Sequence, residues 1–250
     1  MKFALPNLLR GERLTVLLAL AGVTAIAWRY LFVAQLDMSM PAMSAMPDMP
    51  MPFDATWVFA MWWIMMIGMM LPSAAPMILT FATVQRRKRE RDEPYVPTAL
   101  FVAAYLIIWG GFSLAATAAQ WALQQSALLS PVLALAPPLG GVVFIIAGLY
   151  QLTPLKYACL SHCRSPFAFV LNHWRDGWFG ALRMGAGHGL YCLGCCWVLM
   201  ALLFAVGVMN LLWVAVIAAF VFVEKLLPGG VWLGRIGGGA IAAFGIWLLV

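Results

Sequence analysis

The chain has few charged residues for its length. Only 10% of its 250 residues are Asp, Glu, Lys or Arg, and the mean hydropathy is +0.93. A soluble domain carries roughly 25% charged residues, because its surface has to be hydrated. This composition excludes a soluble fold and predicts an integral membrane protein. Its positive excess falls in short clusters between long apolar runs, so it does not indicate nucleic-acid binding.

The sequence also lacks a nucleotide-binding motif and a cysteine pattern suited to disulfides. The chain contains no G-x4-G-K-[ST] loop, and the segments between its apolar runs are too short for a soluble domain that binds nucleotide. The five cysteines are odd in number and all lie between positions 159 and 196, which is a poor disulfide framework. We therefore expect metal or redox chemistry at the cysteines, and the sequence favours a binding or transport role over catalysis.

Long apolar runs predict the fold class, an all-α polytopic membrane helix bundle. A helix needs about 20 mainly apolar residues to cross a bilayer, and seven segments meet this requirement, with a turn at "GVMN" (207–210) separating the fifth and sixth. We predict an N-terminal anchor helix (1–34), a Met/Pro-rich outer loop (35–55) and a six-helix membrane core (56–250). The seven predicted spans are Leu14 to Ala34, Thr56 to Thr83, Thr98 to Leu123, Val132 to Thr153, Arg183 to Val206, Asn210 to Leu226 and Val231 to Val250.

Basic residues predict the orientation of these spans. Cytoplasmic loops of membrane proteins collect Lys and Arg. Here they occur before the first span, in "QRRKRERDE" after the second, after the fourth, and around the turn between the sixth and seventh. The alternate loops at 35–55, 124–131 and 207–210 contain neither Lys nor Arg. We expect a multi-pass protein of the bacterial inner membrane with a cytoplasmic N-terminus.

Methionine is concentrated in the outer loop and in the second span. Prolines deny the loop a regular structure, so its thioethers are expected to face the outside. Thioethers are soft, neutral ligands that suit Cu(I), and we interpret the loop as a metal-capture segment. The loop methionines are Met38, Met40, Met43, Met46, Met49 and Met51.

The second span carries further methionines at helical spacing. Met61, Met65 and Met69 recur every four residues and share one helix face. Met66, Met70 and Met77 lie around another face, while Pro72 and Pro76 interrupt the helical hydrogen bonds beyond them. Broken membrane helices often line binding cavities. We interpret the three-residue face as a ligand ladder entering the bilayer; the alternative is that methionine fills gaps in an apolar core.

Cysteine and histidine form two clusters on the inner side. In the fifth span, a rotation of about 100° per residue places one group on a narrow stripe, namely Met184, His188, Cys192 and Cys195, with Cys196 at its edge. The second cluster follows the fourth span and contains Cys159, His162 and Cys163. The intervening chain is long enough for the clusters to meet at one site. Thiolate and imidazole select Cu(I) or Zn(II).

Other interpretations of these residues stay open. Cys192-x2-Cys195 also has the spacing of a dithiol exchange centre, and Cys196 can serve as a small buried apolar residue. Glu224 and Lys225 lie near the end of the sixth span. Either both side chains have a snorkelling or neighbouring-charge role near the interface, or Glu224 supplies an acid beside an ion path.

Several long motifs resemble a known family. "MWWIMMIGMMLPSAAPMI" (61–78), "YQLTPLKYACLSHCRSP" (150–166), "GALRMGAGHGLYCLGCCWVLM" (180–200), "GVMNLLWVA" (207–215) and "VEKLLP" (223–228) resemble the bacterial family of predicted metal-binding integral membrane proteins, over roughly residues 55–245. The methionine-rich loop lies outside this shared core and favours copper. By resemblance, the family's pattern is carried by Cys159, Cys163, His188, Cys192, Cys195 and Cys196.

Together these patterns predict a soft-metal-binding membrane protein that captures Cu(I) and transfers or delivers it across or within the inner membrane, with zinc as the alternative metal. We expect its partners to be membrane lipid, the metal ion, and either other membrane subunits or a periplasmic metal donor; nucleic acid is excluded. Two other functions remain: a membrane thiol-disulfide relay, and an accessory or assembly subunit of a larger copper enzyme complex.

Overall fold

Helices make up most of the part of the chain that the structure describes. The computed structural model describes residues 5–39, 53–130 and 134–250, and within these ranges it contains no strand beyond one isolated bridge between Leu129 and Leu135. The predicted all-α class is confirmed for this part of the chain. The helices are α1 (Leu5–Ser39), α3 (Ala55–Arg89), α4 (Thr98–Gln125), α5 (Pro137–Gln151), α6 (Pro154–Arg164), α7 (Pro166–His173), α8 (Gly177–Val206), α9 (Leu211–Leu226) and α10 (Gly230–Trp247).

Each of the seven predicted spans contains a helix, but not every helix is long enough to cross a membrane. Among the described residues, four helical segments are long and apolar enough, namely 13–36 of α1 and all of α3, α4 and α8. The helices α5 and α6 meet at a break of 64° and satisfy the same test only as a bent pair. The helices α9 and α10 are shorter, with 16 and 18 residues. The predicted bundle therefore has four clear candidate spans.

Several helix boundaries differ from the predicted ones: α3 ends at Arg89 rather than Thr83, and α5 begins at Pro137 rather than Val132. The helix α1 ends at Ser39 rather than near Ala34, and α8 begins at Gly177 rather than Arg183. The predicted turn at 207–210 is confirmed: Gly207 has a φ of +95°, which favours glycine, and the Asn210 side chain accepts a hydrogen bond from the Trp213 amide as the N-cap of α9.

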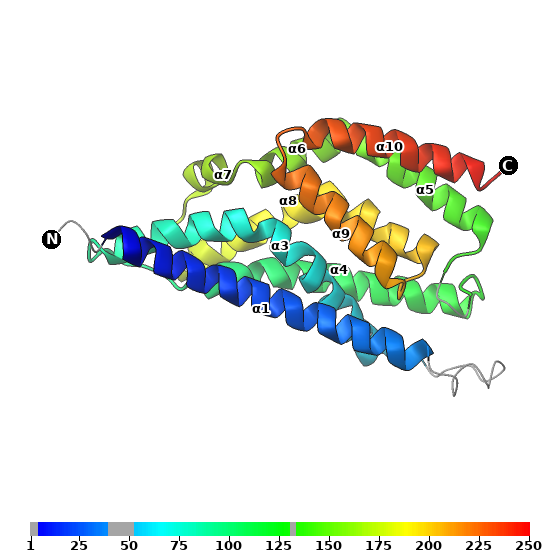
Figure 1. Ribbon diagram of the computed structural model, residues 1–250, viewed down its shortest axis with the longest axis horizontal. Coiled ribbons are helices and arrows are strands. Elements are labelled where there is room, and N and C mark those ends of the chain that lie inside the picture. The colour runs from blue at the N-terminus through cyan, green and yellow to red at the C-terminus, as the bar shows by residue number, and fades with distance from the viewer. Residues whose placement is uncertain (1–4, 40–52, 131–133) are drawn as a thin grey trace.

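The helices pack side by side along the long axis of the molecule (Figure 1). The helix α3 lies between α1 and α4, α8 packs on α4, and α5 pairs with α10. The helix α9 contacts α3 and α8, and α6 also packs on α8. As a result, α8 is surrounded by segments far apart in the sequence. The start of α1 and the end of α10 lie at opposite ends of the molecule (Figure 1).

Pro72 and Pro76 lie inside α3 without ending it. A proline has no N–H to donate, so Pro72 leaves the carbonyl of Gly68 without its helical partner. The indole Nε1 of Trp28 in α1 donates to this carbonyl at 3.2 Å. The glycine is what allows this approach, because a Cβ at position 68 would lie 3.3 Å from the Ala27 Cβ. The two helices are thus joined at the point where the α3 ladder is interrupted.

Large apolar side chains are found both in the buried core of the bundle and exposed on its outside. The α3 methionines Met61, Met65, Met66, Met69, Met70 and Met77 are all buried, at 0–2% exposure. Many large apolar side chains on the outside of the bundle are exposed instead. They include Leu18, Ile26, Ile107, Leu114, Phe179, Leu190, Leu212 and Trp247.

Candidate metal centre

The predicted stripe on α8 is buried in the middle of the bundle. Its members are all at most 2% exposed, and glycines on the same helix allow α4 to approach closely. A Cβ at Gly189, for example, would lie 2.9 Å from the Cβ of Ile108 in α4. The buried stripe consists of Met184, His188, Cys192, Cys195 and Cys196.

Cys192 is the centre of the contacts in this stripe. Its Sγ lies 3.1 Å from the Tyr105 hydroxyl of α4 and 2.9 Å from the Nζ of Lys225 in α9. Its backbone carbonyl accepts hydrogen bonds from two further thiols, those of Cys195 at 3.1 Å and Cys196 at 2.9 Å. Three sulfur atoms and a buried ammonium therefore occupy one small region.

The helix α6 brings part of the second cysteine cluster to this region. The Cys163 thiol interacts with the thiols of Cys192 and Cys195. Cys159 lies on the neighbouring side of α8, where a Cβ at Gly194 would be 2.7 Å from its Sγ. His162 is turned elsewhere: its ring stacks on Tyr191 with centroids 4.1 Å apart. The two sequence clusters thus meet through Cys163.

His188 is buried without a hydrogen-bond partner for either ring nitrogen in the described part of the chain. It is 2% exposed and stacks against Tyr105, with ring centroids 5.6 Å apart. It lies one helical turn before Cys192 and interacts electrostatically with the thiols of Cys192 and Cys195. A buried polar group without a partner costs about 1–3 kcal/mol, and such a group calls for an explanation in a ligand or a catalytic role.

The methionines of α3 reach the thiols at one residue. The Sδ of Met70 lies 3.8 Å from the Sγ of Cys196, and its backbone carbonyl accepts hydrogen bonds from the Tyr105 hydroxyl at 3.2 Å and the Ser73 hydroxyl at 2.9 Å. No such sulfur contact is formed in the described part of the chain by the predicted ladder residues Met61, Met65 and Met69. The contact between the α3 methionines and the α8 thiols is therefore made by the α3 face that carries Met70.

Lys225 lies inside the core and does not snorkel to an interface. It is 5% exposed, and its Nζ lies 3.2 Å from the Ser73 Oγ as well as next to Cys192. The sequence did not point to Tyr105 or Ser73, and it named Lys225 and Met70 without predicting their contacts with the thiols. The available signal was the pair of ionisable residues within the apolar run of "VFVEKL", because such residues in a membrane segment usually have a function.

The neighbouring residue Glu224 belongs to a separate buried ion pair. Its carboxylate binds the ammonium of Lys156, which also donates to the Gln151 side chain. This pair lies where α5 breaks into α6. The Arg164 guanidinium donates to the carbonyls of Glu224 and Leu227. These bonds hold the end of α9 against α6, and so keep Lys225 and Cys163 at the same site.

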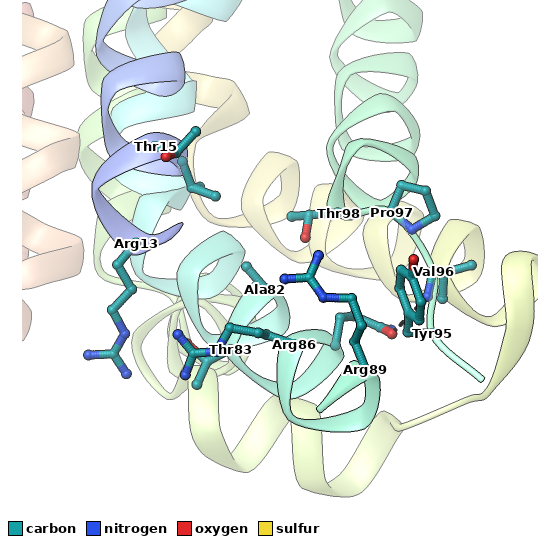
Figure 2. A pocket seen from close by; sticks show the side chains of 12 residues that line it. Arg13, Thr15, Ala82, Thr83, Arg86, Arg89, Tyr95, Val96, Pro97 and Thr98 are labelled. Carbon is teal, nitrogen blue, oxygen red and sulfur yellow. Dashed lines mark hydrogen bonds between the residues drawn. The ribbon is translucent and has the colours of Figure 1, made fainter. Parts of the chain in front are cut away.

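A second polar feature lies apart from the thiols. Arginines of α1 and α3 line a cavity of about 260 Å³ next to the start of α4 (Figure 2). Within it, Arg86 forms an ion pair with Glu90, with Nε and Oε1 3.3 Å apart. Its lining contains no Cys, His or Met, so this cavity is not part of the metal centre. It is lined by Arg13, Thr15, Val16, Ala82, Thr83, Gln85, Arg86, Arg89, Tyr95, Val96, Pro97 and Thr98.

The thiols are close together but are not arranged around a single point. Within residues 5–39, 53–130 and 134–250, no three His, Cys, Asp or Glu side chains form a ready-made metal site. The reason is visible at Cys195 and Cys196, whose thiols turn back to the Cys192 carbonyl. The predicted outer-loop ligands Met40, Met43, Met46, Met49 and Met51 lie outside the described residues, and of Met38 only the backbone in α1 is described.

Comparison with known proteins identifies a family to which most of the chain is similar. The model of a family described as "PpoB2: Copper chaperone" matches residues 59–248. This range includes α8, α6, α9 and the methionines of α3, and it supports the resemblance to a metal-related family. No curated protein and no solved structure matches the chain.

Proposed function

The chain belongs to the PpoB2 copper chaperone family, and we propose that it binds Cu(I) within a membrane, at a site made by His188 and the thiols of α8 and α6. The observation that carries this proposal is the buried imidazole of His188, whose two nitrogens have no hydrogen-bond partner among the described residues, next to Cys192. A metal ion bound by this imidazole and the adjacent thiolates would supply the missing partner.

The donor set suits Cu(I). Thiolates and thioethers are soft ligands that favour Cu(I), and imidazole binds copper and zinc. Cys192, Cys195, Cys196 and Cys163 supply the sulfur, and Met70 adds a thioether beside Cys196. The thiols of Cys195 and Cys196 donate to the Cys192 carbonyl in the structure. Metal binding requires both to turn away from this carbonyl, and rotation about their Cα–Cβ bonds allows this. Zinc is the alternative ion for the same residues.

A membrane location is supported by two features of the bundle. Four helices are long and apolar enough to span a bilayer, and large apolar side chains such as Ile26, Phe179 and Leu212 are exposed on its outside. An exposed apolar surface of this kind is stable in lipid and prone to aggregation in water. We place the protein in the bacterial inner membrane with its N-terminus in the cytoplasm, following the distribution of Lys and Arg.

The proposed route of the ion starts at the outer-loop methionines and continues along α3. The contact between Met70 and Cys196 supports a transfer of the ion from thioether to thiolate at this residue. Met61, Met65 and Met69 remain proposed ligands on the adjacent face. Met184, Cys159 and His162 remain proposed contributors at the edge of the site. Affinity would rise along the route, because thiolates bind Cu(I) more strongly than neutral thioethers do.

Metal content tests the proposal. Full-length protein in mild detergent would be loaded anaerobically with Cu(I), and copper would be measured by mass spectrometry. We expect near-stoichiometric copper in the wild type and loss of copper in a Cys192→Ser, Cys195→Ser double variant. Cys159→Ser changes a thiol at the edge of the site, where a Cβ at Gly194 would approach its Sγ, and it should lose less copper than the double variant.

A wild type that takes up no copper would overturn the proposal. Thiol labelling and co-purification would then separate the remaining functions. A thiol relay is expected to show a dithiol that cycles between reduced and oxidised forms without metal. An accessory subunit of a copper enzyme complex is expected to purify with stoichiometric partner chains.

A further inference from the structure

A buried cation is an unexpected neighbour for a site that binds a cation. Lys225 is 5% exposed, and its Nζ lies 2.9 Å from the Cys192 Sγ. Its ammonium also interacts electrostatically with the thiols of Cys195, Cys196 and Cys163. The side chain thus faces every thiol of the cluster, and its charge acts on any ion that the cluster holds.

Lys225 has no carboxylate partner within the described part of the chain. The ion pairs there involve Lys156 with Glu224, Lys88 with Asp176, and arginines with nearby glutamates, but not Lys225. Its other neighbour is the neutral Ser73 hydroxyl, 3.2 Å away. The direct contacts of the ammonium are therefore a thiol and a hydroxyl, while the Glu224 carboxylate, which acts on it electrostatically from a greater distance, is paired with Lys156.

The effect of this charge depends on the charge of the bound ion. The Coulomb energy between two charges is proportional to their product and becomes larger where water is excluded. At the same distance, the Lys225 ammonium repels a divalent ion twice as strongly as a monovalent one. The attraction of the thiolates for either ion has the same dependence, so a fixed positive charge in the site reduces the advantage of the divalent ion.

We propose that Lys225 is the residue that selects a monovalent soft cation, Cu(I) or Ag(I), over divalent ions such as Zn(II) at the thiols of α6 and α8. The inference rests on the proposed function and adds the class of ion. The long, flexible lysine side chain can withdraw from Cys192 towards Ser73 when the ion enters. It stays buried next to the site, because α9 packs on both α8 and α3.

The inference is tested by comparing the affinities of the full-length protein for Cu(I), Ag(I) and Zn(II), measured anaerobically in detergent by competition with chelators. Lys225→Gln removes the charge and keeps a group that can donate to Ser73 and Cys192, and Lys225→Met removes both. Lys225→Arg keeps the charge. We expect the ratio of Zn(II) to Cu(I) affinity to rise about tenfold or more in the Gln and Met variants, and to stay close to the wild-type ratio in the Arg variant.

The result that would overturn the inference is an unchanged ratio in Lys225→Gln while Cu(I) still binds. A ratio that rises equally in the Arg variant would also overturn it, because the change would then follow side-chain shape and not charge. Failure of the proposed function looks different: the wild type would bind neither Cu(I) nor Ag(I). If the Met variant does not fold, the comparison of the Gln and Arg variants still decides.

Discussion

Lys156 and Lys225 are two buried lysines on either side of the end of α9, and they differ in what balances their charge. Lys156 is fully buried with a carboxylate and an amide, those of Glu224 and Gln151. Lys225, one residue further along the chain from Glu224, faces thiols and a hydroxyl. The first pairing is a buried ion pair with a carboxylate from another helix. The second involves the thiols of the proposed metal site, so we assign a structural role to Lys156 and a role in the proposed site to Lys225.

The largest effect on stability is expected when the buried ion pair of Lys156 and Glu224 is broken. Glu224→Gln leaves the Lys156 ammonium buried without a counter-charge, and breaking a buried pair in this way costs about 3–5 kcal/mol. Thermal unfolding in detergent should show a large loss of stability. The double variant Lys156→Met, Glu224→Leu removes both charges and should recover most of it. A single variant as stable as the wild type would mean that the pair is not a structural element.

A smaller effect is expected when the space around this pair is reduced. In α10, a Cβ at Gly234 would touch the Glu224 carboxylate and lie 3.5 Å from the Lys156 Nζ. Gly234→Ala should therefore destabilise the protein by about 1–3 kcal/mol, the usual cost of overpacking. Gly239 lies on the same helix with open space around its Cβ position. Gly239→Ala should leave the unfolding temperature unchanged or raise it slightly, and equal losses in both variants would contradict this account.

The third expected effect concerns the stability of the metal-free protein when Lys225 is changed. Lys225→Gln loses an ammonium whose partners are a hydroxyl and thiols, and no carboxylate is left buried. We expect a loss of about 1 kcal/mol, the net value of a typical hydrogen bond, measured by the same thermal unfolding. A loss as large as that of Glu224→Gln would remove the distinction between the two lysines.

The smallest expected effect comes from an exposed pair. The hydrogen bond from Lys88, with a second from Trp174, holds the pKa of Asp176 below its usual range. Because the folded-state pKa is lowered, this carboxylate stabilises the fold above its unfolded pKa, and the contribution is lost as the pH falls through the folded pKa. Asp176→Asn should lower the unfolding temperature slightly at neutral pH and not at all in acid. A difference that persists in acid would contradict this assignment.

Helical periodicity in the sequence predicted which candidate residues lie together on one helix. The stripe from Met184 to Cys195 follows directly from the rotation of an α-helix, and it is buried as a unit. The turn at 207–210 was also recognisable, because glycine and asparagine there suit a helix end and a helix start. Both depend on local geometry, which the sequence encodes at fixed spacing.

The contacts between helices could not be predicted in the same way. Met70 and Met69 are adjacent in sequence and equally buried in α3, yet the contact with Cys196 is made by Met70. Which of them faces α8 depends on how α3 is rotated in the bundle. The position of Lys225 depends likewise on how the end of α9 packs against α6. The hydrogen bonds from Arg164 to the carbonyls of Glu224 and Leu227 hold it there.

The hydrogen bond from Trp28 to Gly68 has a consequence for what counts as the minimal protein. The family match begins at residue 59 and excludes α1, yet α1 supplies the donor that Pro72 takes from the α3 backbone. A chain cut to the matched region would leave the Gly68 carbonyl without this donor, next to the buried methionines Met69 and Met70. The N-terminal helix α1 therefore packs on α3 and satisfies a backbone carbonyl of that helix, and its removal is expected to destabilise α3.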